Sequence, residues 1–173
     1  HVALVCEVSG TADRVKLERV SVCADCGVAV HPDQAVAQLE SGVVTGLIQA
    51  LRSKITVKNG RVEQSNFHDF LLPRMNQVPP VQVEIVQTGG KPGGLGEVGT
   101  PLVAPALANA VFALTGKRIR STPLEDGGVR FTYPPRRQLR AAQQYPAGWP
   151  EVIPRARRGP RSSPHPPTVC VSA

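Results

Sequence analysis

Two apolar runs at the start of the chain predict the first structural element. Residues 1–8 and 15–23 are rich in Val and Leu, and a Ser-Gly-Thr-Ala-Asp cluster separates them. Apolar runs of this length bounded by turn residues are typical of strands. We therefore expect a β-hairpin at the front of the chain.

A helical spacing of apolar residues follows over residues 32–52. Pro32 suits the first turn of a helix. Glycines 42 and 46 interrupt the helix, and each costs about 1 kcal/mol relative to Ala, so we expect a close packing partner or a ligand against that face. Small and apolar residues recur at intervals of three and four, at Ala35, Leu39, Val43, Gly46, Leu47 and Ala50.

The middle of the chain predicts two shorter β elements and a loop. Residues 55–57 and 61–63 flank Lys58-Asn59-Gly60, a hairpin signal, and residues 66–75 are expected to be irregular. Residues 81–86 alternate apolar and polar positions, as in a half-buried strand. Five glycines in residues 88–96 then allow a close approach of the backbone to another group.

A second helix is expected over residues 101–114, which are apolar and Ala-rich and are followed by Gly116. The expected fold class is α+β, with antiparallel strands and two main helices. The order of the elements alone leaves their packing open.

The amino-acid composition changes from about Glu125 onward. Nine of the 17 prolines lie between Pro134 and Pro167, mixed with Arg, Gln and Ser, and no hydrophobic period is visible. We expect a domain over residues 1–124 and a disordered Pro/Arg-rich tail over residues 125–173. The tail composition also resembles out-of-frame translation of GC-rich DNA, so a departure from the true reading frame near residue 124 is a second hypothesis.

The net charge of +7 falls mostly on this tail. Residues 1–123 carry 12 basic and 10 acidic side chains, and residues 124–173 carry 8 and 3. A stand-alone module that binds nucleic acid or an acidic surface through the tail is thus an alternative hypothesis. The aromatic content of 4% argues against base stacking. The sequence predicts no membrane span, and it leaves periplasm or cytoplasm open.

Glu97 is the sharpest candidate for chemistry. It lies in Gly93-Gly-Leu-Gly-Glu-Val-Gly-Thr-Pro101, directly before the second predicted helix. Backbone amides at a helix start suit an anionic ligand, and a partly buried carboxylate there suits a proton acceptor. A flexible turn with a solvated glutamate explains the same residues.

The other motifs are weaker evidence for a functional site. The pattern Gly94-x-Gly96-x-x-Gly99 matches the dinucleotide fingerprint, but several residues separate it from the preceding strand and no acidic residue follows about 20 positions on. The pair Cys23-x-x-Cys26 lacks a second pair and is interpreted as structural rather than as half of a zinc or redox site. The histidines at positions 31 and 68 are interpreted as loop residues.

Three long segments in order carry a resemblance to a known family. They are DCGVAVHPDQAVAQLESGVVTGL, ITVKNGRVEQSNFHDFLLPRMNQVPPVQVEIV and PGGLGEVGTPLVAPALANAVFALTGKRIRSTPL. They resemble the C-terminal part of the molybdenum-binding large subunits of the xanthine dehydrogenase and aldehyde oxidase family, in particular the isoquinoline oxidoreductase and aldehyde dehydrogenase branch. The resemblance covers about residues 1–124.

The resemblance implies a role for three residues. Glu97 stands where this family has its catalytic base for hydroxylation of aldehydes or N-heterocycles with water-derived oxygen. Gln38, otherwise interpreted as a hydrogen-bonding residue on the helix face, stands where the family has a glutamine bonded to the pterin, and Gly96 lies where the backbone approaches the molybdenum site. The implied cofactor is molybdopterin with molybdenum, in the cytosine dinucleotide form. The implied partners are a small iron–sulfur subunit and a cytochrome c electron acceptor.

This sequence departs from the family pattern at His31, Ser41 and Val98, where many relatives have Asn, Gly and Pro. Packing near the cofactor is therefore expected to differ. The chain starts without Met in a strand-like run, so we expect a fragment of a longer subunit that is inactive alone.

Overall fold

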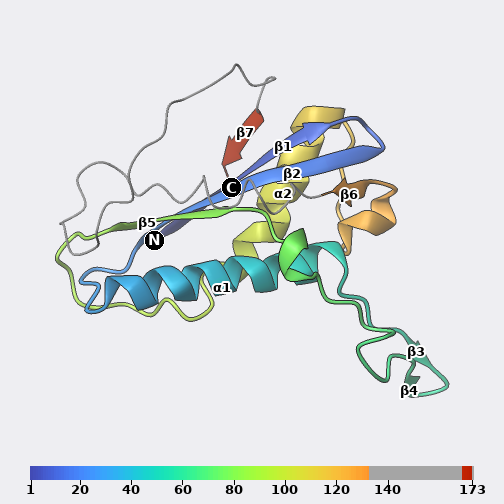
Figure 1. Ribbon diagram of the computed structural model, residues 1–173, viewed down its shortest axis with the longest axis horizontal. Helices are drawn as coiled ribbons and strands as arrows, with labels where there is room; N and C mark the ends of the chain where they lie inside the picture. Colours follow the sequence, from blue (N-terminus) through green and yellow to red (C-terminus); the bar gives the residue numbers. More distant parts are fainter. Residues whose placement is uncertain (133–168, 173) are drawn as a thin grey trace.

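The computed structural model describes residues 1–132 and 169–172. Two helices lie against a mixed sheet, and a two-stranded arm extends away from them (Figure 1). The elements in chain order are β1 (Val2–Gly10), β2 (Arg14–Asp25), α1 (Pro32–Leu51), β3 (Val57–Lys58), β4 (Arg61–Val62), η1 (Met75–Gln77), β5 (Val81–Val86), α2 (Thr100–Thr115), η2 (Leu124–Gly127), β6 (Arg130–Thr132) and β7 (Val169–Ser172).

The main sheet is built around the predicted hairpin. β1 and β2 pair antiparallel, with an irregularity between Glu7 and Val8, and β7 pairs antiparallel with the other edge of β1. β5 and β6 pair parallel with different halves of β2. The predicted α+β class is confirmed, and the sheet is mixed because these two strands join β2 in parallel.

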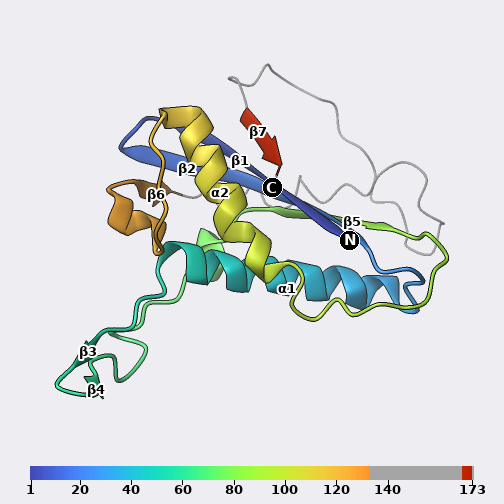
Figure 2. The same cartoon turned by 180° about the vertical axis from the view of Figure 1, so that it is seen from behind.

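The helices pack against the sheet and against each other. α2 packs on β1, and α1 packs on β5 (Figure 2). Leu4, Cys6 and Val8 alternate inward along β1 and are fully buried, as the period of a strand requires. Leu39 of α1 and Leu107 of α2 are also fully buried and belong to the same core.

Both predicted helices are confirmed, with local signals at their ends. Pro32 occupies the first turn of α1, and Nδ1 of His31 accepts a hydrogen bond from the backbone N–H of Gln34 at 3.3 Å. The His31 side chain thus caps the start of the helix. α2 ends at Gly116, whose φ of 71° is left-handed, a conformation that favours glycine. Among the described residues, no helix is long and apolar enough to span a membrane.

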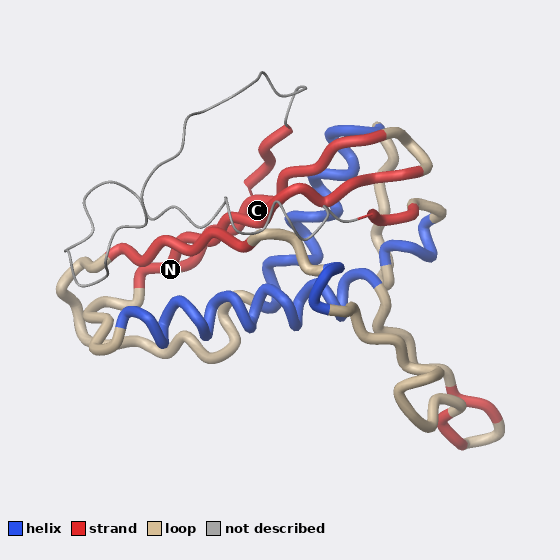
Figure 3. The backbone as a smooth tube through the Cα atoms, in the orientation of Figure 1, coloured by secondary structure: helices blue, strands red, loops and turns tan. Residues whose placement is uncertain are grey.

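The hairpin of β3 and β4 projects beyond the end of α1 (Figure 3), and we call residues 53–74, which carry it, the arm. Its tip is the predicted hairpin, in which Asn59 and Gly60 have φ angles of 50° and 74°. Positive φ at both central residues is the requirement of a tight hairpin turn that matches strand twist. The Asn-Gly signal therefore identified this turn correctly.

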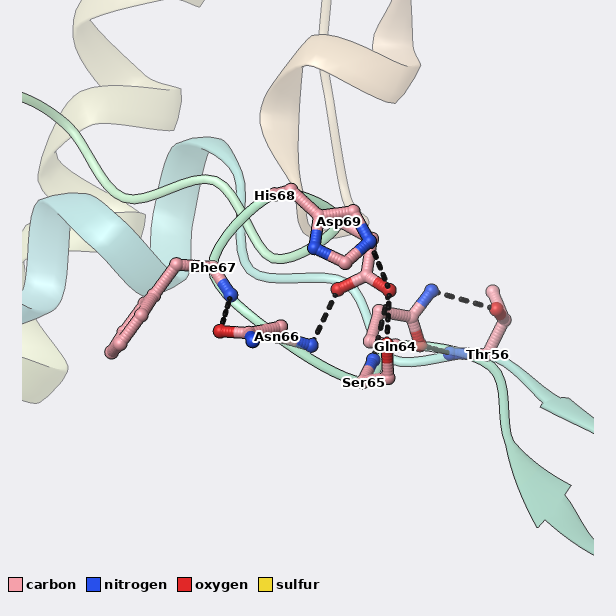
Figure 4. A network of polar contacts seen from close by, with 7 residues as sticks. All are labelled: Thr56, Gln64, Ser65, Asn66, Phe67, His68 and Asp69. Carbon is pink, nitrogen blue, oxygen red and sulfur yellow. Dashed lines mark hydrogen bonds and ion pairs between the residues drawn. The ribbon is translucent and has the colours of Figure 1, made fainter.

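A carboxylate organises the turn at the base of the arm (Figure 4). Asp69 accepts hydrogen bonds from the backbone N–H groups of Asn66 and Ser65, both at 2.9 Å, and from the Ser65 hydroxyl at 3.1 Å. These bonds favour the charged form and lower the pKa of Asp69 from 3.8 to about 2, with His68 adding a smaller effect. His68 lies on the arm, far along the chain from Glu97, as a loop residue.

We expect this turn to persist under mild acid. Because the pKa of Asp69 is depressed in the folded turn, its stabilisation is complete above the ordinary value of 3.8 and is lost as pH falls through about 2. In an NMR titration of the chain, the Ser65 and Asn66 amide shifts should move with a midpoint near pH 2. A midpoint near the ordinary aspartate value would contradict the network, and Asp69→Asn should remove the transition.

Part of the predicted tail is folded. η2 and β6 occupy residues 124–132 with Val129 and Phe131 buried, and β7 pairs with β1. The expectation of disorder from residue 125 onward is therefore wrong for residues 125–132 and 169–172. Composition averaged over the segment hid these apolar positions. Residues 133–168 and 173, which carry most of the net positive charge, lie outside the described residues, so the reading-frame and nucleic-acid hypotheses stay predictions.

Candidate functional site

The candidate site is built on the loop between β5 and α2, residues 87–99, which we call the glycine loop. Its beginning is attached to the end of β2. Oδ1 of Asp25 accepts hydrogen bonds from the backbone N–H of Gly27 and from the Thr88 hydroxyl, both at 2.9 Å. The Gly27 amide and then the Thr88 hydroxyl hold the pKa of Asp25 below its usual value.

The glycine loop also runs in contact with the residues that follow β2. The backbone N–H of Gly93 donates to the carbonyl of Cys26 at 2.8 Å. Gly27 has a φ of 74°, and a Cβ there would lie 2.3 Å from the carbonyl oxygen of Lys91. A side chain at position 27 would therefore have to displace the loop backbone. Glycine is required at this position for two reasons, the positive φ and the close approach of the loop.

Two predicted cofactor residues meet at the far end of the loop. Nε2 of Gln38, on α1, donates a hydrogen bond to the carbonyl oxygen of Gly96 at 2.8 Å. Both residues are exposed to solvent. Among the described residues this is the one hydrogen bond of the Gln38 side chain, so its Oε1 acceptor and its second amide hydrogen remain available.

Glu97 follows directly and lies just before α2. Its side chain is exposed, while its backbone carbonyl accepts a hydrogen bond from the N–H of Thr100 at 3.0 Å. A Cβ built at Gly94 or Gly96 would have no heavy atom within 4 Å, so the outer side of the loop is open. The carboxylate thus sits on a loop whose backbone is tied on both sides of it and whose outer side has room for a bound group.

The loop ends where the two helices touch. A Cβ at Gly46 would lie 2.6 Å from the carbonyl oxygen of Thr100, and one at Gly42 would lie 3.4 Å from the Cα of Gly99. The Thr100 hydroxyl donates to the carbonyl of Gly42 at 3.1 Å. The internal glycines of α1 therefore serve a close backbone-to-backbone contact that fixes the start of α2 (Figure 2).

The start of α2 adds a favourable field for anions. Its N-cap, Gly99, offers no side-chain hydrogen bond, and the helix runs for 16 residues. Pro101 has no N–H, and the Thr100 N–H already donates to the Glu97 carbonyl, so the start of α2 attracts negative charge mainly through the positive end of the helix dipole. The glycine loop, Gln38 and the start of α2 could together contact an anionic, hydrogen-bonding cofactor, with Glu97 beside it as a proton acceptor.

Sequence reasoning missed Asp25, Thr88 and Thr100. Asp25 carried a usable local signal, because Asp two residues before a positive-φ Gly is typical of an Asx-turn. The contact to Thr88 spans 63 residues and leaves no local pattern.

The thiols of Cys23 and Cys26 are free, and within residues 1–132 no group of three or more potential metal-ligating side chains is found.

Comparison with known proteins gives the family. Residues 1–79 match the family model of the molybdopterin cofactor-binding domain. The chain is 38% identical over 126 residues to isoquinoline 1-oxidoreductase subunit beta of Brevundimonas diminuta, covering 72% of this chain and 16% of that protein. It is 33% identical over 115 residues to the membrane-bound aldehyde dehydrogenase [pyrroloquinoline-quinone] of Gluconacetobacter polyoxogenes, covering 66% of this chain and 15% of that protein.

A solved structure agrees on the fold. The Cu,Mo-CO dehydrogenase matches with a TM-score of 0.58 and 24% identity, over 64% of this chain and 15% of that one. The chain spans about a sixth of the length of the relatives it matches, 16% for the isoquinoline enzyme. Over the matched part, this chain belongs to the molybdenum-binding subunits of the xanthine dehydrogenase and aldehyde oxidase family, with a molybdopterin cofactor-binding domain.

Proposed function

We propose that this chain is part of a molybdenum hydroxylase that oxidises aldehydes or N-heterocycles with water-derived oxygen, with Glu97 as the general base. The observation that carries the proposal is the hydrogen bond from Gln38 to Gly96. It joins a helix of the matched cofactor-binding region to the loop that carries Glu97. The proposed base and the proposed cofactor contact therefore lie close together, on two segments that this hydrogen bond joins.

The residues present fit the cofactor. Molybdopterin carries phosphate and many hydrogen-bonding atoms, so it needs backbone N–H groups, side-chain amides and space. The start of α2 supplies the positive end of a helix dipole, Gln38 has a free acceptor and a free donor hydrogen, and the loop backbone is open at Gly94 and Gly96. The cofactor, when bound, supplies the two-electron oxidation of the substrate carbon.

The chain's own contribution is to place a proton acceptor. A carboxylate oxygen of Glu97 would take the proton from the oxygen nucleophile, which requires hydrogen-bond reach of about 3 Å. The Gln38 amide at Gly96 and the Thr100 N–H at the Glu97 carbonyl restrict the backbone on both sides of that residue. Holding the base in this way lowers the entropic cost of reaching the reactive arrangement.

Finer features of the proposal follow from the family resemblance. They are the cytosine dinucleotide form of the cofactor, an iron–sulfur subunit that takes electrons away, and a cytochrome c acceptor beyond it. A two-electron oxidation needs an acceptor for its electrons, so turnover would require an electron-transfer partner. Because the chain corresponds to 16% of the isoquinoline relative, we propose that it does not turn over by itself.

We expect Gln38→Ala to weaken cofactor retention in the whole enzyme. Loss of an outer-shell hydrogen bond typically costs about tenfold or more in affinity. Stability should change by less than about 0.5 kcal/mol, because the side chain is exposed. The measurement is molybdenum by mass spectrometry and released pterin by fluorescence, each per mole of protein after dialysis.

The matched control for this variant is Gln49→Ala, an exposed glutamine farther along α1. It should keep the full cofactor content. Equal retention in the two variants would remove Gln38 from the cofactor site.

A further inference from the structure

The attachment of the glycine loop to the end of β2 has no role in the function proposed so far. It consists of three contacts close together, which we call the clasp: the Thr88 hydroxyl on Asp25, the Gly93 N–H on the Cys26 carbonyl, and the packing of Gly27 against the loop backbone. Asp25 stands at the centre, since one oxygen, Oδ1, accepts from both Gly27 and Thr88.

The clasp holds the half of the loop that α1 does not reach. From Gly96 onward the loop is held by Gln38 and by the helix crossing. Up to and including Gly93 the contacts come from residues 25–27. Between these two sets of contacts lie Gly94 and Leu95, and Gly94 has open space around it. If the clasp opened, the loop would be held at one end and the backbone entering Glu97 would gain freedom.

We infer that Asp25 and Thr88 are positioning residues for Glu97, acting through the glycine loop and without contact to substrate or cofactor. This inference rests on the proposed role of Glu97. The chemistry of the bond fits the task, because a hydroxyl donating to a carboxylate is charge-assisted and directional. The Asp25 carboxylate is held in place by the Gly27 N–H, which donates to Oδ1, the same oxygen that accepts the hydrogen bond from the Thr88 hydroxyl. The depressed pKa of Asp25 keeps the acceptor charged in neutral solution.

Hydrogen exchange measured in the whole protein that contains this chain tests whether the clasp holds the glycine loop. Thr88→Val removes the hydroxyl with little change of shape, and Thr88 is exposed, so the fold should tolerate it. Loss of a hydrogen bond to a charged group should speed exchange of the Gly93 N–H about tenfold. Thr88→Ser keeps a hydroxyl and should restore the slow rate. Unchanged exchange in Thr88→Val would overturn the clasp.

The arm provides a matched control. The Thr56 hydroxyl also donates to a carboxylate, that of Glu63, at 2.7 Å. Thr56→Val therefore removes the same kind of bond far from the glycine loop, together with the bond that the hydroxyl accepts from Nε2 of Gln64 at 2.9 Å. It should leave the Gly93 N–H exchange rate unchanged. Faster exchange at Gly93 in this variant would mean that the effect is global, which would overturn a local clasp.

Kinetics of the whole enzyme test the functional half. A base held less precisely lowers kcat while substrate binding is kept, so Thr88→Val should lower kcat about tenfold with KM within about twofold. Thr88→Ser should recover kcat, and the Thr56→Val control should match the unaltered enzyme. A purely structural role would instead lower the amount of folded, cofactor-loaded enzyme and leave kcat per molybdenum unchanged, and that result would overturn positioning.

The two proposals can fail separately. If Glu97→Gln abolishes turnover and Thr88→Val alters neither exchange nor kcat, the clasp is wrong and the function stands. If Glu97→Gln remains fully active, the proposed function falls and the positioning role falls with it, whatever the exchange data show for the loop.

Discussion

Replacing Glu97 by glutamine in the whole enzyme is expected to lower kcat by about a hundredfold to ten-thousandfold, the usual contribution of a positioned general base. Glutamine keeps the size of the side chain and one acceptor oxygen but cannot take up a proton. The side chain is exposed and the Gln38 and Thr100 contacts use the backbone, so the fold of the loop should persist. KM should stay nearly constant, because the lost interaction operates in the transition state.

The comparison that isolates this effect is Glu84→Gln, at an exposed glutamate of β5, the strand that precedes the glycine loop. It changes charge by the same amount and should retain full turnover. Both variants should contain as much molybdenum as the unaltered enzyme. Glu97→Gln with full kcat would refute its role as the base.

The second large effect is expected at the crossing of the helices. Gly46→Val should destabilise the fold by about 3 kcal/mol, the upper part of the range for overpacking a close contact. The first added atom already lies 2.6 Å from the Thr100 carbonyl oxygen and 2.6 Å from a Val103 methyl group. Gly46→Ala should cost less, because its higher helix propensity offsets about 1 kcal/mol of the clash. Urea unfolding followed by circular dichroism measures both.

Gly94→Ala is the control, since an added Cβ there meets nothing within 4 Å. It should shift the free energy of unfolding by less than about 0.5 kcal/mol. Equal stability of Gly46→Val and the unaltered protein would show that α1 and α2 do not cross as closely as described. Gly46→Val should also lower cofactor retention, because Gly99 and Glu97 move with the start of α2.

The elements that sequence reasoning predicted well are those with a local cause. The hydrophobic period, Pro32 and Gly116 identified the helices, and Asn59-Gly60 identified the tip of the arm. The parallel pairing of β5 and β6 with β2 depends on segments far apart in sequence. Such pairing leaves no periodic signal in either strand. Phe131 was missed because one buried aromatic residue stands at the edge of a segment dominated by Pro and Arg.

In the candidate site, too, features with a local sequence signal were predicted and features that depend on packing were not. The Gly-rich context made Glu97 and Gly96 visible in the sequence, whereas a role for Gln38 came from the family resemblance. That Gln38 bonds to Gly96, and that the glycines of α1 face Gly99 and Thr100, follows from the packing of helices 58 residues apart. We expected a packing partner or a ligand at the glycines of α1, and the structure shows a packing partner, the start of α2.

The most direct test of the account is the metal content of the protein that contains this chain, purified whole from a host that makes molybdenum cofactor. Molybdenum measured by mass spectrometry, together with pterin released on denaturation, should be present in stoichiometric amounts and should fall in Gln38→Ala but not in Gln49→Ala. A folded protein free of molybdenum and pterin, or one in which both variants retain them equally, would contradict the assignment of the site.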